Sequence, residues 1–222
     1  MEYNTLKQQL KVYFIMGSLN CRAEPEQVLE QALKGGATLF QYREKGEGCL
    51  SSDQKYALAL ILQKICGKYH VPFIINDDID LMISLNADGL HVGQEDGDLN
   101  QIRSRIPDKI LGVSVHNVEE AEDALRAGAD YLGVGPIFDT STKMDTRDVM
   151  GFSVLKELRA AGITAPIVGI GGIFRENAFE VIEAGADGVS VISAISLHVD
   201  PEKAASGLLE RVEKAWKARL IN

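Results

Sequence analysis

The sequence lacks the features that mark several large classes of protein. Its 222 residues hold three cysteines, Cys21, Cys49 and Cys66, and no CxxC pair, which argues against a disulfide framework and against a zinc site. A net charge of −9 without any basic cluster argues against a nucleic-acid partner. The longest early apolar stretch, residues 12–16, is too short to span a bilayer, and no signal-peptide pattern surrounds it. We therefore expect a cytoplasmic protein without membrane or nucleic-acid partners, either a monomer or a homo-oligomer.

The apolar residues that are present alternate between two periods along the chain. Eight short β-branched runs are each followed by a stretch with helical spacing, which is typical of repeated βα units. The predicted strands span residues 12–17, 38–45, 72–77, 89–93, 110–115, 131–136, 166–172 and 188–194. The predicted helices lie near residues 25–34, 51–69, 79–85, 99–105, 118–127, 152–161, 175–184 and 201–220. This strict alternation favours the α/β class and a single-domain (β/α)8 TIM barrel over residues 1–222.

Several predicted strands begin with the same local pattern. A glycine or asparagine that can end a helix stands two residues before a threonine or aspartate. The segments are Gly36-Ala37-Thr38, Asn86-Ala87-Asp88, Gly128-Ala129-Asp130 and Gly185-Ala186-Asp187. Their irregular spacing indicates repeated construction within one barrel and argues against a solenoid.

Barrel enzymes carry their active sites at the carboxyl ends of the strands, so polar residues there are the candidates. In the second predicted strand Gln41, Arg43 and Lys45 occupy alternate positions, and a period of two places them on one face. If that face points inward, an amide and two cations meet at the barrel mouth, where they need an anionic partner. The alternative is an outward charged face with the neighbouring aromatic residues inside the barrel.

The third and fourth predicted strands are followed by carboxylates. Asp77 comes directly after Asn76 at the end of the third strand, and Asp96 comes shortly after the fourth. Adjacent strands would bring both carboxylates to one rim, and Mg²⁺ typically takes one or two protein carboxylates while its other positions hold water and phosphate. The alternative is that each aspartate caps the helix that follows it.

Three further segments suit phosphate binding. The long connection 137–151 after the sixth predicted strand carries Thr140-Ser141-Thr142-Lys143, which offers hydroxyl groups and an ammonium group. The seventh predicted strand ends at Gly171-Gly172 and the eighth at Ile192-Ser193, where barrels often bind phosphate through backbone N–H groups and a helix N-terminus. Packing is the alternative explanation for the glycines.

The fifth predicted strand and the histidines complete the candidate set. Ser114, near the end of that strand, can donate a hydrogen bond to a phosphate oxygen. We interpret the histidines, which form no HxH or HExxH pair, as structural or solvated: His70, His91, His116 and His198. No nucleophile with its general base is evident, so the polar residues indicate anion stabilisation.

Six segments in a fixed order carry these candidates. They are Gln41-Tyr42-Arg43-Glu44-Lys45, Ile75-Asn76-Asp77-Asp78, residues 87–96, Gly112-Val113-Ser114, Gly135-Pro136-Ile137-Phe138 with Thr140-Ser141-Thr142-Lys143, and Gly169-Ile170-Gly171-Gly172-Ile173. This ordered set resembles the thiamine-phosphate synthase (thiamine-phosphate pyrophosphorylase) family over nearly the whole chain.

The resemblance implies a role for each group of residues. Those for a pyrimidine diphosphate would be Gln41, Tyr42, Arg43, Glu44, Lys45, Asn76, Ser114 and Lys143. Those expected to act in catalysis are Arg43, Lys45, Ser114 and Lys143. Those for a thiazole phosphate would be Thr140, Ser141, Thr142, Gly172, Ile192 and Ser193. The Mg²⁺ ligands would be Asp77 and Asp96, whereas Asp139 places an anion beside the expected thiazole phosphate site.

The implied reaction joins 4-amino-2-methyl-5-(diphosphooxymethyl)pyrimidine to 4-methyl-5-(2-phosphooxyethyl)thiazole and releases pyrophosphate, a step of thiamine biosynthesis. Mg²⁺ is the implied cofactor, and a dissociative course through a pyrimidine cation is expected. A thiazole tautomerase of the same superfamily is the nearest alternative. More distant alternatives are a phosphosugar isomerase, which Mg²⁺ independence would favour, and a metabolite-binding protein without activity.

Overall fold

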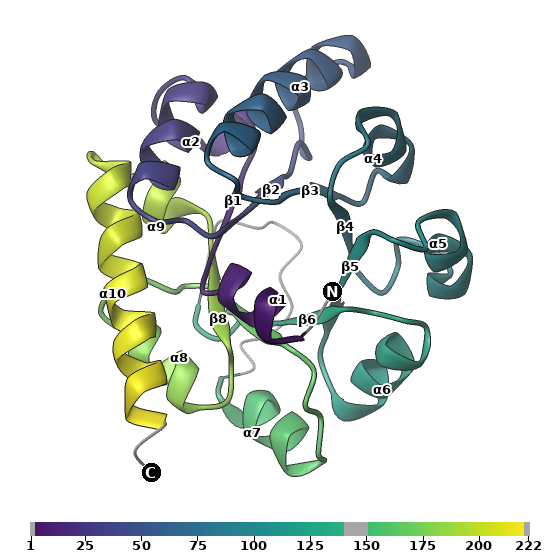
Figure 1. The fold of residues 1–222 in the computed structure, drawn as a ribbon, viewed down its shortest axis with the longest axis vertical. Coiled ribbons are helices and arrows are strands. Elements are labelled where there is room, and N and C mark those ends of the chain that lie inside the picture. The colour runs from purple at the N-terminus through teal and green to yellow at the C-terminus, as the bar shows by residue number, and fades with distance from the viewer. Residues whose placement is uncertain (1–2, 140–150, 220–222) are drawn as a thin grey trace.

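The strands of the computed structural model, which describes residues 3–139 and 151–219, form a closed barrel. Within these residues eight parallel strands follow one another around the barrel in chain order, and β8 pairs with β1 (Figure 1). The strands are β1 (Val12–Met16), β2 (Leu39–Tyr42), β3 (Phe73–Asn76), β4 (Gly89–Val92), β5 (Ile110–Val115), β6 (Tyr131–Val134), β7 (Ile167–Ile170) and β8 (Gly188–Val191). The predicted (β/α)8 barrel is confirmed.

Helices surround the barrel, as Figure 1 shows. Those that the sequence predicted are α2 (Pro25–Lys34), α3 (Ser52–Lys68), α4 (Ile79–Leu85), α5 (Leu99–Arg105), α6 (Val118–Arg126), α7 (Ser153–Ala160), α8 (Ala178–Glu183) and α10 (Pro201–Arg219). The sequence pattern missed α1 (Tyr3–Gln9), the 3-10 turn η1 (Ser18–Asn20) and α9 (Ser193–Ser196), because these elements are additional to the eight strand–helix pairs that the alternation predicts. In the part of the chain that the structure describes, no helix has the length and apolar character needed to cross a membrane.

The sheet separates two apolar layers, and β2 shows how its side chains divide between them. Leu39 and Gln41 point into the barrel, whereas Phe40 and Tyr42 point outward into the core between the sheet and the helices. The strand ends at Tyr42 and not at Lys45, because its backbone ladders to β1 and β3 stop there. The period of two therefore describes the chain only up to this point, and the alternative with the aromatic residues inside the barrel is wrong.

Helix α1 covers the end of the barrel at which the strands begin, and it lies over the barrel centre in Figure 1. Its Leu6 is 1% exposed and Leu10, just beyond the helix, is 0% exposed, and both pack against Tyr13, Ile74 and other residues of the barrel interior. These leucines exclude water from the interior at this end. A site that uses the barrel interior must then open at the carboxyl ends of the strands, where barrel enzymes place their chemistry.

The repeated pattern at the strand entries has a structural purpose. In each case the threonine or aspartate accepts a hydrogen bond from the backbone N–H of the first or second residue of the preceding strand. The pairs are Val12 with Thr38 at 2.9 Å, Phe73 with Asp88 at 2.8 Å, Leu111 with Asp130 at 2.8 Å and Ile167 with Asp187 at 2.9 Å. The pattern thus ties β1 to β2, β3 to β4, β5 to β6 and β7 to β8, and it satisfies buried donors at the amino end of the barrel.

Candidate active site

A cluster of one cation and two carboxylates lies at the carboxyl end of the barrel. Lys45 follows β2, Asp77 comes directly after β3, and Asp96 lies beyond β4. The Lys45 Nζ is 2.8 Å from Asp77 Oδ2. The Asp96 carboxyl group contacts that of Asp77 and also accepts the Gly93 N–H at 2.7 Å. The structure therefore brings together, from three neighbouring strands, side chains that the sequence placed separately at this rim.

Asp77 is held in an unusual backbone conformation. Its φ of +59° lies in the left-handed region, which residues other than glycine seldom adopt. The Asp77 N–H donates to the His91 carbonyl at 2.9 Å and so prolongs the contact between β3 and β4. The caps of α4 and α5 are Asp78 and Asp98, so the helix-cap alternative for Asp77 and Asp96 is wrong. Backbone strain at a carboxylate with no capping task is typical of functional sites.

The charges of this cluster alter one another's ionisation. Partial burial raises the pKa of Asp96, the Gly93 N–H opposes this, and the neighbouring Asp77 carboxyl raises it further. The hydrogen bond to Asp77 raises the pKa of Lys45, while the positive charge of Arg43 acts in the opposite direction. Two carboxylates that repel each other form a place where additional positive charge is stabilising.

Gln41 and the residues after it face different parts of the molecule. The Gln41 side chain is 1% exposed, and its Nε2 donates to the Tyr13 hydroxyl inside the barrel at 2.6 Å. Tyr42 lies in the core between the sheet and the helices, away from the barrel interior. Arg43 follows the end of β2 and is half-buried close to Lys45. A contact of Gln41, Tyr42 or Arg43 with a ligand at the mouth stays a prediction.

Glu44 joins the loops after β1 and β2. Its carboxylate accepts the Ser18 N–H at 2.8 Å, the Ser18 hydroxyl at 2.6 Å and the Leu50 N–H at 3.0 Å. These bonds use both carboxylate oxygens, and the residue is 9% exposed. Glu44 therefore shapes the loop that carries Arg43 and Lys45, and its own carboxylate is engaged within the protein.

Polar side chains also occupy the inward face of β3, β4 and β5 near the mouth. Asn76 pairs in register with His91, whose Nε2 is 3.0 Å from the Ser114 Oγ. Gln94 adds a hydrogen bond from its Nε2 to the Ser114 carbonyl at 2.6 Å. The sequence pattern predicts a structural or solvated role for His91 and gives no role to Tyr131, whose hydroxyl is 2.9 Å from His91 Nδ1. Polar residues at inward positions of otherwise apolar strands were the signal that could have identified both.

The glycines at the end of β7 have a packing role. Gly171 and Gly172 have φ values of +97° and +62°, which a residue with a side chain adopts only with strain. A Cβ on Gly172 would lie 2.6 Å from the Asp139 carbonyl oxygen, and the Phe138 N–H donates to the Gly171 carbonyl at 3.1 Å. Close packing against the loop after β6 accounts for these glycines, and a contact of Gly172 with phosphate stays a prediction.

The remaining predicted residues for a thiazole phosphate lie after β6 and β8. Ile192 is 7% exposed, and Ser193 begins α9 beside it. Asp139 is exposed at the end of the described segment. Outside the described residues lie Thr140, Ser141, Thr142 and Lys143.

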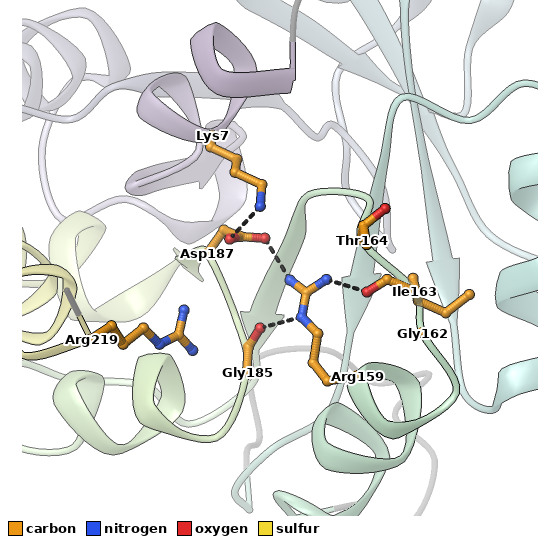
Figure 2. Close-up of a pocket in the computed structure, with 8 residues that line it drawn as sticks. All are labelled: Lys7, Arg159, Gly162, Ile163, Thr164, Gly185, Asp187 and Arg219. Carbon is orange, nitrogen blue, oxygen red and sulfur yellow. Dashed lines mark hydrogen bonds and ion pairs between the residues drawn. The ribbon is translucent and has the colours of Figure 1, made fainter. Parts of the chain in front are cut away.

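A hollow of about 410 Å³ lies at the opposite end of the barrel and is shown in Figure 2. At its centre Asp187 pairs with Arg159 at 2.6 Å and with Lys7 at 3.1 Å. Arg159 also donates to the carbonyl groups of Gly185 at 2.9 Å and Ile163 at 2.7 Å. These contacts hold the entries of β7 and β8 together, so we assign this group a structural role.

Comparison with known proteins decides the family. Residues 12–195 match the family model described as thiamine monophosphate synthase. The chain belongs to the thiamine monophosphate synthase family. It is 58% identical over 210 residues to the thiamine-phosphate synthase of Geobacillus kaustophilus strain HTA426, covering 95% of each chain. It is also 56% identical over 209 residues to the enzyme of Bacillus cereus strain ATCC 10987, covering 94% of this chain and 93% of that one.

A solved structure of the thiamine monophosphate synthase family agrees with these matches. The thiamine phosphate pyrophosphorylase from Pyrococcus furiosus superposes with a TM-score of 0.84 at 33% identity, covering 95% of this chain and 98% of that chain. The chain is therefore a transferase of thiamine biosynthesis with thiamine-phosphate synthase activity. The resemblance drawn from the motifs is confirmed, and the matches favour the synthase over the tautomerase, isomerase and metabolite-binding alternatives.

Proposed function

We propose that the enzyme joins 4-amino-2-methyl-5-(diphosphooxymethyl)pyrimidine to 4-methyl-5-(2-phosphooxyethyl)thiazole and releases pyrophosphate. The observation that carries this proposal is the cluster of Lys45, Asp77 and Asp96 at the barrel mouth. Cations beside paired carboxylates suit a diphosphate that is bound together with a metal ion. Gln41, buried behind the mouth, offers the kind of directional polar group that orients a heterocycle.

Mg²⁺ is the proposed cofactor, and the residues present fit it. Asp77 and Asp96 would supply carboxylate oxygens, the ligands that Mg²⁺ prefers. Their mutual repulsion, which contributes to the raised pKa of Asp96, would be relieved by a divalent cation. No cluster of three or more His, Cys, Asp or Glu side chains occurs among the described residues, and Mg²⁺ at diphosphate sites needs only one or two protein carboxylates. When bound, it would neutralise part of the diphosphate charge.

The chain's own groups support a dissociative reaction. The bond between the pyrimidine methylene carbon and the diphosphate oxygen breaks, and its electron pair leaves with the diphosphate. Lys45 and Arg43 stabilise the negative charge that develops there. The amino substituent of the pyrimidine stabilises the cation that remains, and the thiazole nitrogen uses its lone pair to form the new C–N bond. No proton has to be removed from the thiazole nitrogen, which agrees with a site that needs no general base.

Other assignments rest on the family resemblance. Asn76 and Ser114 lie on the inward face near the mouth, where they can contact the pyrimidine diphosphate. Lys143 is proposed for the same substrate from its motif alone. The thiazole phosphate is proposed to bind near the ends of β7 and β8, through Gly172, Ile192 and Ser193 and through Thr140, Ser141 and Thr142.

One assay tests the reaction and its cofactor together. Purified enzyme is incubated with both phosphorylated heterocycles and Mg²⁺, and thiamine phosphate and pyrophosphate are measured at the same time. Equal amounts of the two products that vanish when either heterocycle or Mg²⁺ is omitted are the expected result. Pyrophosphate release without the thiazole would indicate hydrolysis, and full activity in the presence of a strong chelator would exclude a required metal.

Asp77→Asn tests the metal site directly. Loss of the carboxylate charge would weaken the hold on Mg²⁺, which would stabilise the leaving diphosphate, so kcat/KM should fall by roughly 100-fold, the scale of losing one electrostatic stabiliser of a developing anion. The Mg²⁺ concentration at half-maximal rate should rise. Asp80→Asn is the matched control, because Asp80 lies nearby on α4 with its side chain 82% exposed and pairs with Arg105 at 2.6 Å. Near-normal turnover of Asp77→Asn across a Mg²⁺ titration would remove Asp77 from the metal site.

A further inference from the structure

A chain of hydrogen bonds runs through the barrel interior from β2 to β5. The Gln41 Nε2 donates to the Tyr13 hydroxyl at 2.6 Å, and that hydroxyl is 2.8 Å from the Tyr131 hydroxyl. Tyr131 is 2.9 Å from His91 Nδ1, and His91 Nε2 is 3.0 Å from the Ser114 Oγ. The chain therefore links the buried Gln41 to a serine at the mouth.

The donor at one end of these hydrogen bonds and the burial of the two tyrosines set their direction. Tyr13 is 1% exposed and Tyr131 is 0% exposed, so each hydroxyl hydrogen needs an acceptor within the protein. Gln41 presents its NH₂ group, which can only donate, to Tyr13. Tyr13 then donates to Tyr131, and Tyr131 donates to His91 Nδ1. In the reverse direction, the Tyr13 hydroxyl hydrogen would point at the Gln41 NH₂ group, which is itself a donor.

We propose that this chain holds His91 as the neutral tautomer with its proton on Nε2, so that His91 donates to Ser114 and the Ser114 hydroxyl donates its own hydrogen into the mouth. Ser114 is half-buried there, and the acceptor it fits is an anionic oxygen. That the oxygen belongs to the diphosphate rests on the proposed function. Tyr13, Tyr131 and His91 are then positioning residues, because they act through Ser114.

The packing around the chain keeps its members in place. A Cβ at Gly112 would overlap the Tyr131 ring and hydroxyl, so glycine at that position makes the room that this tyrosine occupies. The His91 and Tyr131 rings stack with centroids 5.5 Å apart and planes 28° apart, and Tyr13 meets Tyr131 edge-on at 5.8 Å. Burial raises the pKa of both tyrosines, so each keeps the hydrogen that it donates.

Nitrogen NMR of the wild-type enzyme without substrates tests the tautomer. The protein is labelled with ¹⁵N histidine, and His91→Gln assigns the signals of His91. A proton on Nε2 and an unprotonated Nδ1 at neutral pH are expected. A proton on Nδ1, or protons on both nitrogens, would overturn the proposal. His198 is the internal control, because it is exposed and takes no part in these hydrogen bonds: its Nδ1 lies 2.8 Å from the Asp200 carbonyl oxygen and 3.0 Å from the Asp200 N.

Kinetics test whether Tyr131 acts through Ser114. Tyr131→Phe keeps the ring but removes the donor to His91, and we expect kcat/KM to fall about five- to tenfold, the scale of one neutral hydrogen bond. In a Ser114→Ala background the same change should have almost no further effect. An equal loss in both backgrounds would refute action through Ser114. Tyr69→Phe is the matched control, since it removes a tyrosine hydrogen bond to Glu30 at the periphery.

The two experiments separate the inference from the proposed reaction. The NMR measurement needs neither substrate nor turnover, so a proton on Nδ1 refutes the tautomer even if coupling is fully active. Conversely, absence of coupling in the omission assay would refute the proposed function while leaving an Nε2 proton in place as support for the hydrogen-bond direction.

Discussion

Replacing Asp187 by alanine is expected to destabilise the barrel strongly. Its side chain is 9% exposed, and its Oδ2 accepts the Arg159 guanidinium at 2.6 Å and the Ile167 N–H at 2.9 Å (Figure 2). Its Oδ1 pairs with Lys7 at 3.1 Å. Alanine would leave the N–H of the fully buried Ile167 without its acceptor and Arg159 without its carboxylate.

The contacts around Asp187 allow the size of the effect to be worked out. A buried donor left without a partner costs about 1–3 kcal/mol, and removing one member of a buried ion pair costs about 3–5 kcal/mol in total. The Arg159 and Lys7 side chains remain 25% and 28% exposed, and Arg159 keeps its carbonyl acceptors, so the lower end of the range, about 3 kcal/mol, applies. For a chain of this size that corresponds to a fall in Tm of roughly 6–12 °C.

Urea and thermal unfolding followed by circular dichroism measure this loss. Asp123→Ala is the matched control, because Asp123 pairs with Arg126 on the surface of α6 with side chains 59% and 73% exposed, and a change of at most ~0.5 kcal/mol is expected. The kcat of folded Asp187→Ala should match that of the wild type, since Asp187 lies at the end opposite the mouth. If both variants lost the same small amount of stability, the hydrogen bond from the Ile167 N–H to Asp187, which joins β7 to β8, would not be needed to stabilise the barrel.

Two further predictions concern a helix cap and the cysteines. Partial burial acts to raise the pKa of Asp78. The Lys55 ammonium at 2.7 Å and the Leu81 N–H at 2.9 Å outweigh it, so the pKa of Asp78 is lowered. The stabilisation is therefore full at neutral pH and lost as the pH falls through that lowered pKa. Urea unfolding should show that Asp78→Ala costs about 1 kcal/mol at pH 7 and progressively less as the pH is lowered; a cost that does not change with pH would contradict this. Cys66 is 1% exposed, and burial raises the pKa of its thiol, so a thiol reagent should label the exposed Cys49 first. Peptide mapping measures the order, and rapid labelling of Cys66 in the native protein would show that its thiol is not protected.

The sequence by itself determined the architecture and the order of the elements. Apolar periodicity reports the one face that each element buries, and this local signal placed α2 (Pro25–Lys34) and α5 (Leu99–Arg105) at the bounds that the structure shows. It also placed Asp77 and Asp96 after adjacent strands, and the parallel order of a barrel then puts both at one rim. The predicted end of β2 was wrong, because a strand ends where its hydrogen-bonded neighbours end.

Only the tertiary structure decided which polar side chains meet. Tyr13 and Tyr131 are 118 residues apart in the chain, yet their hydroxyls are 2.8 Å apart, because closure of the barrel brings the inward faces of β1 and β6 together. The left-handed conformation of Asp77 and the engagement of Glu44 by the loop after β1 likewise depend on contacts between segments. Periodicity describes one element at a time, so it can show that a side chain points inward but not which partner it finds there.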